Sequence, residues 1–87
     1  MSTLKIEEIG DVVEVVVWFQ GGKIMPLRFR WRSRTYKVKH VNGVWRSEIG
    51  RDHFHHFAVA SDSADVYELA YNEHSGIWKL EKVALGG

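Results

Sequence analysis

The residues with the clearest chemical potential are cations that alternate with apolar side chains in the middle of the chain. Successive side chains of an extended strand point to opposite faces, so the pattern from Leu27 onward predicts one apolar face and one cationic face. Residues 28–39 hold half of the twelve Lys and Arg residues and no acid. Such a ribbon could bind the phosphates of a nucleic acid or another polyanion, with an exposed ring nearby for base stacking. The six cations are Arg28, Arg30, Arg32, Arg34, Lys37 and Lys39.

A second interpretation of the same ribbon needs no ligand. An antiparallel sheet with one face in water shows the same alternation. Its cations can pair with carboxylates on neighbouring strands, for which Glu7, Glu8, Glu14 and Glu68 are available. The polyanion hypothesis requires the cations to gather on one face without acidic partners. The alternative requires them to be dispersed or neutralised one by one.

The histidines are the next candidates for chemistry. His53 and His55 lie two residues apart in a segment that we expect to be a strand, so both rings would face one side and could share a metal ion. His40 or His74 could supply a third ligand. A stable zinc site needs three or four ligands, and these spacings match no known template. We therefore expect polar histidines on a solvated face, one of which could fill a gap in the core by hydrogen bonding, and no metal or other cofactor.

Catalytic motifs are missing from the sequence. There is no cysteine, and no serine lies in the Gly-x-Ser-x-Gly context of a nucleophile elbow. The pair Gly21–Gly22 lacks the rest of a phosphate-binding loop. We expect the protein not to be an enzyme.

Length and composition limit the protein further. The 87 residues predict a single domain over 1–87, and a hydrophobic content of 45% can fill a modest core. The absence of cysteine fits a reducing compartment. No apolar run is long enough for a membrane span, and the N-terminus lacks the apolar stretch of a signal peptide. We expect a cytoplasmic protein without a membrane partner.

Turn signals divide the chain into short strands. Strands are expected over residues 12–20, 23–32, 36–41, 53–60, 66–71 and 77–85, with a short return at 44–46. Turns are expected at Gly21–Gly22, at residues 32–35 and at Asn42–Gly43, with loops over residues 47–52, 61–65 and 72–76. Residues 1–10 would form a lead-in that is either strand or irregular, and residues 86–87 a frayed end. The pattern predicts an all-β fold, an antiparallel meander of six or seven short strands, curled into a small SH3-like barrel or two packed sheets.

The segment Val12–Gln20 is apolar on both faces of its expected strand. One face carries alternate residues from Val13 to Phe19, and the other carries Val12, Val16 and Trp18 with Glu14. Such a strand is expected to be central or covered on both sides. If the chain itself does not cover Val12, Val16 and Trp18, these residues are candidates for a protein interface or a homodimer contact.

A series of strand residues also carries a family resemblance. It comprises Pro26, Phe29, Trp31, Arg34, Tyr36, Val38, Val41, Trp45, His56, Phe57, Val59, Tyr67, Glu68, Leu69, Trp78 and Leu80. The series resembles small bacterial domains of unknown function that share a Pro…Phe-x-Trp…Tyr-x-Val…Trp pattern and end in a Tyr-Glu-Leu…Trp-x-Leu hairpin. Those domains have a glycine in the turn after the Trp, where this chain has Ser33. The resemblance implies a fold and no catalytic residue.

Three functions follow in order of support. The first is a non-enzymatic module that binds nucleic acid or another polyanion through the basic hairpin. The second is a protein-interaction or homodimerisation domain that uses the apolar face around Val12–Trp18. The third is a metal-binding or enzymatic protein that uses His53 and His55.

Overall fold

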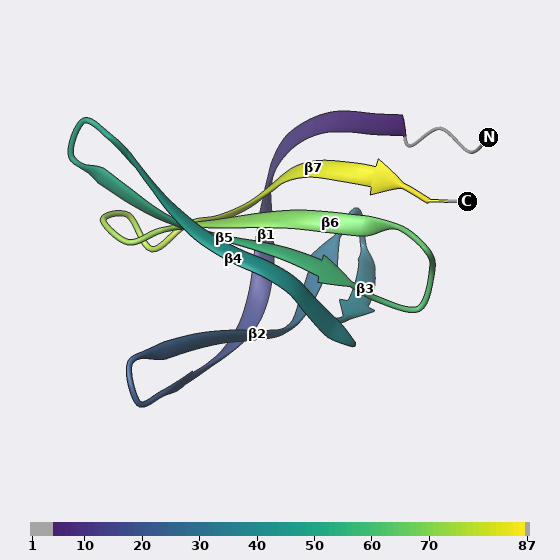
Figure 1. The fold of residues 1–87 in the computed structure, drawn as a ribbon, viewed down its shortest axis with the longest axis horizontal. Coiled ribbons are helices and arrows are strands. Elements are labelled where there is room, and N and C mark those ends of the chain that lie inside the picture. Colours follow the sequence, from purple (N-terminus) through teal and green to yellow (C-terminus); the bar gives the residue numbers. More distant parts are fainter. Residues whose placement is uncertain (1–4, 87) are drawn as a thin grey trace.

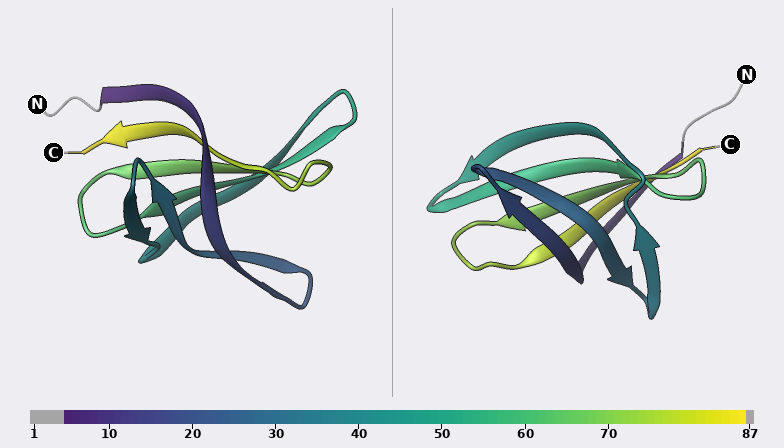
Figure 2. Two further views of the ribbon diagram at one scale, coloured as in Figure 1. Left: turned by 180° about the vertical axis from the view of Figure 1, so that it is seen from behind. Right: turned by 90° about the horizontal axis from the view of Figure 1, so that it is seen from below.

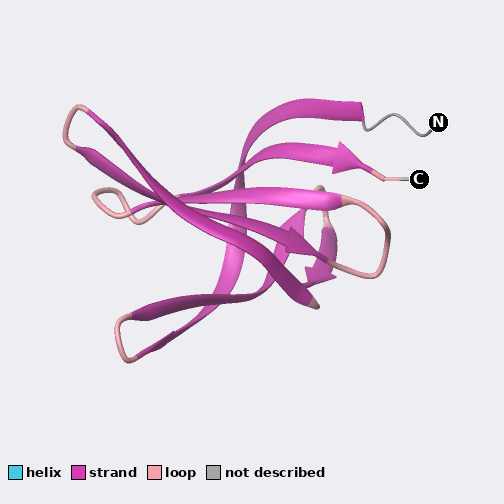
Figure 3. Cartoon of the chain, viewed as in Figure 1, coloured by secondary structure: helices cyan, strands magenta, loops and turns pink. Residues whose placement is uncertain are grey.

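The protein consists of seven antiparallel strands, and residues 5–86, which the computed structural model describes, contain no helix (Figures 1 and 3). The strands are β1 (Lys5–Gln20), β2 (Lys23–Trp31), β3 (Arg34–Lys37), β4 (His40–Ile49), β5 (Asp52–Ala60), β6 (Val66–Asn72) and β7 (Trp78–Leu85). The all-β fold predicted from the sequence is confirmed. Among residues 5–86, no helix is long and apolar enough to cross a membrane.

Strand β1 connects two parts of the sheet, whose order is β3-β2-β1-β7-β6-β5-β4. Its first half pairs with β7 and its second half with β2, and the change of partner falls between Val13 and Glu14. The strand bends strongly across the molecule between these two partners (Figures 1 and 2). Residues 5–10 of the expected lead-in are therefore strand, which was one of the two alternatives.

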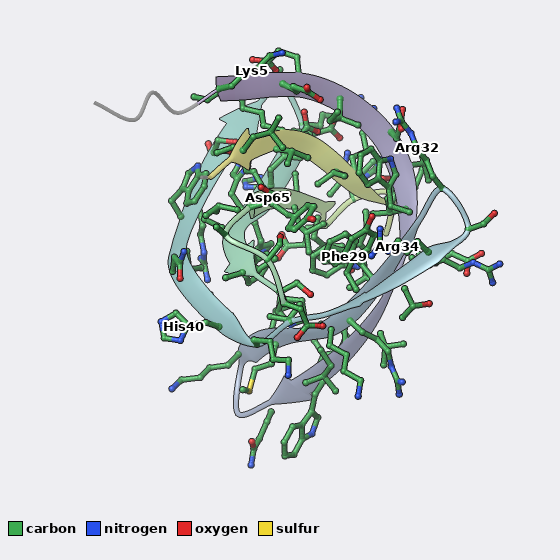
Figure 4. All side chains as sticks on the ribbon, turned by 90° about the vertical axis from the view of Figure 1, so that its right-hand side faces the viewer. Lys5, Phe29, Arg32, Arg34, His40 and Asp65 are labelled. Atoms are coloured by element: carbon green, nitrogen blue, oxygen red, sulfur yellow. The ribbon has the colours of Figure 1, made fainter. Side chains whose placement is uncertain are left out.

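The two edge strands of the sheet, β3 and β4, are consecutive in the chain. The sheet is curled, which brings these two edges close together. At the junction, the Val38 amide donates to the Leu27 carbonyl of β2, and the Lys39 amide donates to the Ala60 carbonyl of β5, both at 2.9 Å. Viewed end-on, the strands form a ring around the interior side chains (Figure 4). No ladder joins β3 to β4 within residues 5–86, so the curled sheet is not closed, and two packed sheets describe it better than a barrel.

The core lies where the two parts of the sheet face each other. Leu69, Leu80 and Val59 are completely buried, and Phe29 is almost so. The remaining buried members of the cluster are Val13, Phe57, Tyr67, Trp78 and Val83. In β5 and β6 these residues come from alternate positions, as the sequence pattern predicts. In β7 a register shift opposite Glu68 and Leu69 puts Leu80 and Val83 three positions apart. Burying such rings and branched side chains is the main stabilising contribution in a domain of this size.

Two tight turns of the N-terminal part have the same backbone conformation but different residues. Gly21 and Gly22 have φ values of 55° and 78°, as expected for a type I′ hairpin turn. Arg32 and Ser33 have φ values of 51° and 63° without the freedom of glycine. Positive φ is unfavourable for such residues. The glycine that the similar domains carry after the Trp would therefore suit this turn better than Ser33.

One turn and one loop that the sequence predicted are mostly strand in the structure. Asn42–Gly43 lies inside β4, where Val41 pairs with Val59 and Gly43 with Ala58, so Asn42 is the extra residue of a bulge. The expected loop Ser47–Asp52 is mostly strand, because β4 runs to Ile49 and the turn comprises only Gly50 and Arg51. In both cases the available edge of β5 determined the structure, because pairing with it satisfies the backbone hydrogen bonds of β4.

The C-terminal end is held as far as residue 86. The Gly86 amide donates to Asp65 Oδ1 at 3.1 Å. Of the two glycines expected to fray, Gly86 is thus attached to the turn before β6, and Gly87 lies outside the described residues.

Candidate functional site

Three of the six predicted cations lie together on the outer face of β2 and β3. Arg28 is directly opposite Lys37 of β3, and Arg30 lies two residues from Arg28 on the same side of β2. All three side chains are exposed. We call Arg28, Arg30 and Lys37 the basic face.

The basic face has no acidic partner. Within residues 5–86, no carboxylate forms an ion pair with any of its three members, although Glu14 of β1 lies opposite Arg30 in register. Arg28 and Lys37, which carry like charges, are cross-strand neighbours, and such pairs destabilise a sheet. The Arg28–Lys37 pair is thus unfavourable for folding, whereas Glu14 is the cross-strand neighbour of Arg30 and offsets part of the charge at that position.

The other three predicted cations are dispersed. The Arg32 guanidinium lies 4.5 Å from the centre of the Trp31 ring, and its Nε is 3.9 Å from Asp11 Oδ2. Lys39 Nζ is 3.3 Å from Asp62 Oδ1. Arg34 Cζ lies 5.5 Å above the Tyr36 ring. Arg32, Lys39 and Arg34 are therefore engaged by rings or carboxylates near their own turns.

The tight turn explains why Arg34 separates from the basic face. Arg34 is the cross-strand partner of Trp31, so it lies on the inner face of the hairpin with the Trp31 ring. Lys37 is the partner of Arg28 and lies on the outer face. Figure 4 shows Arg34 on the inner side of the ring of strands near Phe29, and Arg32 on the outer side. The alternation from Arg28 to Lys39 therefore does not continue through the turn.

A bulge beside Pro26 shifts the alternation within β2. Val16 pairs with Arg28 and Val17 with Pro26, so Leu27 is the extra residue. Leu27 is 43% exposed and does not share the inner face with Phe29, as simple alternation had predicted. The expectation of a bulge or edge at Pro26 is confirmed, since proline lacks the N–H that a continuous ladder needs. A hollow of about 330 Å³ lies at this bulge, between Val16, Arg28 and Arg30.

The predicted interface residues adjoin the basic face. Val12, Val16 and Trp18 are 67%, 47% and 52% exposed, so the chain does not cover the second face of β1 as expected. Val16 lies directly opposite Arg28, and Trp18 is opposite Met25 in the same ladder. Apolar and cationic side chains thus form one continuous outer surface on β1, β2 and β3.

His53 and His55 of β5 point to one side, as predicted, but each contacts a different carboxylate. His53 Nδ1 is 3.3 Å from Glu48 Oε1, and the buried His55 places its Nε2 3.0 Å from Glu73 Oε1. The hydrogen bond from His55 lowers the pKa of the Glu73 carboxyl below its ordinary value of 4.5. No group of three or more potential metal ligands occurs within residues 5–86, so neither His40 nor His74 completes a site there. A metal role stays a prediction, which a lower melting temperature in EDTA would support.

The sequence interpretation missed a cleft on the opposite side of β2. The cleft has a volume of about 550 Å³ and lies between the tip of the β1–β2 hairpin and the strands β4 and β5. Its lining includes Ile24, Pro26, Val41, Val44, Arg46 and Phe57. The available signal was the alternation of side chains in residues 44–46, which include Val44 and Arg46 of the lining. The sequence predicted only a short strand there, followed by a loop, and such a segment was not expected to form one wall of a cleft.

Comparison of this chain with protein-family models, with curated proteins and with solved structures found no match. The resemblance to small bacterial domains of unknown function therefore stays a prediction, and function has to be inferred from the geometry.

Proposed function

We propose that this protein is a non-enzymatic module that binds single-stranded nucleic acid on the outer surface of β1, β2 and β3. The observation that carries the proposal is the basic face itself, in which Arg28, Arg30 and Lys37 are adjacent, exposed and without a carboxylate partner. Phosphate groups would relieve the repulsion between these cations and release counterions on binding.

An exposed ring next to the cations favours a single strand over a duplex. Trp18 is 52% exposed and follows Val16, the neighbour of Arg28, on the same face of β1. An unpaired base can stack on such a ring, while the cations bind the adjacent backbone. Stacking of this kind contributes about 1–3 kcal/mol per base and tolerates any base. We therefore expect little sequence preference.

The direct test measures fluorescence anisotropy of a labelled oligothymidine of about twelve nucleotides. Three phosphate contacts predict a slope of about −2 for the logarithm of the binding constant against the logarithm of salt concentration. The variant Arg28→Glu with Arg30→Glu should weaken binding by more than about tenfold, because it reverses two of the three contacts. Trp18→Ala should weaken binding about fivefold or more through lost stacking.

A matched control separates the basic face from bulk charge. Lys5→Glu with Arg51→Glu changes the net charge by the same amount at exposed positions away from the face. This control should bind nearly as well as the wild type. Wild-type binding by Arg28→Glu with Arg30→Glu, or an equal loss in the control, would contradict the proposal.

A second function is favoured by the apolar part of the same surface. Val12, Val16 and Trp18 together expose apolar area that soluble monomers often use for protein contacts. A homodimer through this surface would cover Trp18 and compete with nucleic acid. Light scattering over a range of concentrations tests it, and a monomer at the highest concentration excludes the dimer.

A further inference from the structure

The cleft missed by the sequence interpretation lies where two hairpins diverge. The β1–β2 and β4–β5 hairpins extend to the same side of the molecule and separate toward their tips (Figure 1). The cleft between them, about 550 Å³ in volume, is lined by apolar side chains from both hairpins, including Ile24 and Val44. Val44 is 61% exposed although it belongs to the inner face of β4, opposite Phe57. No other element within residues 5–86 covers this part of the interior.

The cleft is bordered by two strand edges without partners. Residues 23–26 of β2 pair only with β1, and β4 pairs only with β5, within the part of the chain that the structure describes. At the junction Val38–Lys39 the chain itself fills the place between β2 and β5. Toward the tips of the two hairpins β2 and β4 separate, and the cleft lies between them. No strand of the described residues occupies this space. The unpaired backbone groups on both sides are therefore ready to accept an added strand.

The edge of β4 is only partly protected against pairing with another strand. Natural proteins shorten exposed edges or place charged residues and prolines on them. Strand β4 has ten residues, with the bulge at Asn42 near one end only. Its residues Val44 and Ile49 are 61% and 70% exposed. Arg46 and Glu48 are the charged residues of this strand, so a partner strand that pairs along it has to complement their charges.

The charges at the cleft identify the partner's chemistry. Its lining contains Lys23, Arg46 and His55 but no Asp or Glu. The two nearby carboxylates, of Glu48 and Glu73, are engaged by His53 and His55. A ligand with an acidic group would complement Lys23 and Arg46, and its apolar groups would pack on Val44 and its neighbours.

We propose that this cleft binds an extended peptide segment of a partner protein as an added strand along β4. Because Val44 and Arg46 lie on the same face of β4, the peptide carries an apolar and an acidic residue two positions apart, on its inward face. A single strand fits because residues 20–26 form the opposite wall, where a second strand of a partner sheet would have to lie. Main-chain hydrogen bonds would supply affinity, and the apolar lining and the cations would select side chains.

The test uses a fluorescein-labelled peptide of about eight residues. Its inward positions, which are two residues apart, carry valine and glutamate in turn, and threonine fills the positions between them. A second peptide carries proline at alternate positions, and a third carries lysine in place of glutamate. The first peptide should bind and should slow amide exchange of β4. The proline peptide should bind at least tenfold more weakly, because it cannot donate the strand hydrogen bonds.

Variants of the cleft separate strand addition from other binding. Val44→Asp should weaken the glutamate peptide at least tenfold, and Arg46→Glu should invert the preference in favour of the lysine peptide. Both side chains are exposed, and circular dichroism melting verifies that each variant folds. Ile77→Asp, an exposed apolar position outside the cleft, is the matched control and should bind as the wild type does.

Three outcomes would overturn the proposal. They are equal binding of the proline peptide, wild-type binding by Val44→Asp, and binding of an apolar anionic dye without binding of the glutamate peptide. The last outcome would indicate a site for small amphipathic molecules. The variant Arg28→Glu with Arg30→Glu should retain full peptide affinity, which makes this result independent of nucleic-acid binding.

Discussion

The two ends of the interior have the same strand pattern and very different packing. At one end, the rings of Phe29, Tyr36 and Tyr67 lie 5.0–5.3 Å apart and fill the space between the strands. At the other end, Phe19 and Val44 also belong to inward faces but are 62% and 61% exposed. Alternation therefore specifies which side of a strand faces inward. Burial additionally requires a second element across the gap, and the diverging hairpins lack one.

This difference assigns separate roles to the two ends. The packed end supplies the stability of a small domain, because fully buried side chains contribute most of the hydrophobic free energy. The open end leaves the apolar groups of Phe19 and Val44 exposed. The outer basic face is a third region, and it contributes neither burial nor favourable charge pairing to the isolated chain.

The sharpest test of the comparison deletes side-chain volume at each end. Phe29→Ala at the packed end should lower the free energy of unfolding by about 3–5 kcal/mol, because it leaves a cavity in the core. Val44→Ala at the open end should change it by less than about 0.5 kcal/mol. Urea unfolding measures both. Similar losses at the two sites would show that the open end is packed in solution.

A polar contact beside the packed end should contribute less. Trp31 Nε1 donates to Asp11 Oδ2 at 2.8 Å, which links the end of β2 to β1. Trp31→Phe removes this bond and should cost about 1 kcal/mol in urea unfolding, since the partly exposed carboxylate regains water. Trp45→Phe is the control on the outer face, where the ring stacks on His56 and no hydrogen bond of the indole is present. A loss in the control equal to that in Trp31→Phe would assign the effect to ring area.

The two similar turns offer a change in the opposite direction. Ser33→Gly should raise the free energy of unfolding by about 0.5–1 kcal/mol, because φ of 63° is unfavourable for serine and natural for glycine. Gly22→Ala, at φ of 78° in the other turn, should lower it by a similar amount. Thermal melting of both variants compares the turns. Destabilisation by Ser33→Gly would mean that the serine side chain has a stabilising contact.

The smallest expected effect depends on pH at the open end. The pKa of Glu73 is lowered in the folded state by the hydrogen bond from His55, so the contact stabilises the protein at pH values above the ordinary glutamate pKa of 4.5. This contribution disappears as the pH falls through the lowered folded-state pKa. Wild type should therefore be slightly more stable than Glu73→Gln at pH 7, with the difference vanishing in acid. Urea titrations at several pH values measure it, and a pH-independent difference would exclude the charge as its cause.

Much of the fold could be predicted from the sequence, because local signals control it. Alternation located the two faces of β5, because Phe57 and Val59 share one side of the strand, as expected, and both are buried. Glycine chemistry located the turn at Gly21–Gly22, and the missing N–H of proline located the bulge at Pro26. Each of these signals acts within a few residues, so no knowledge of the tertiary structure was needed.

The partners of each strand were decided only by the tertiary structure. Asn42–Gly43 has the composition of a hairpin turn, but pairing with β5 makes it a bulge. The same holds for the cations, because register determined that Arg28 meets Lys37 while Lys39 reaches Asp62. Composition and alternation thus determined an all-β chain with one basic segment. The curl of the sheet decided which cations stay unpaired and where the interior stays open, because both depend on contacts between residues far apart in the chain.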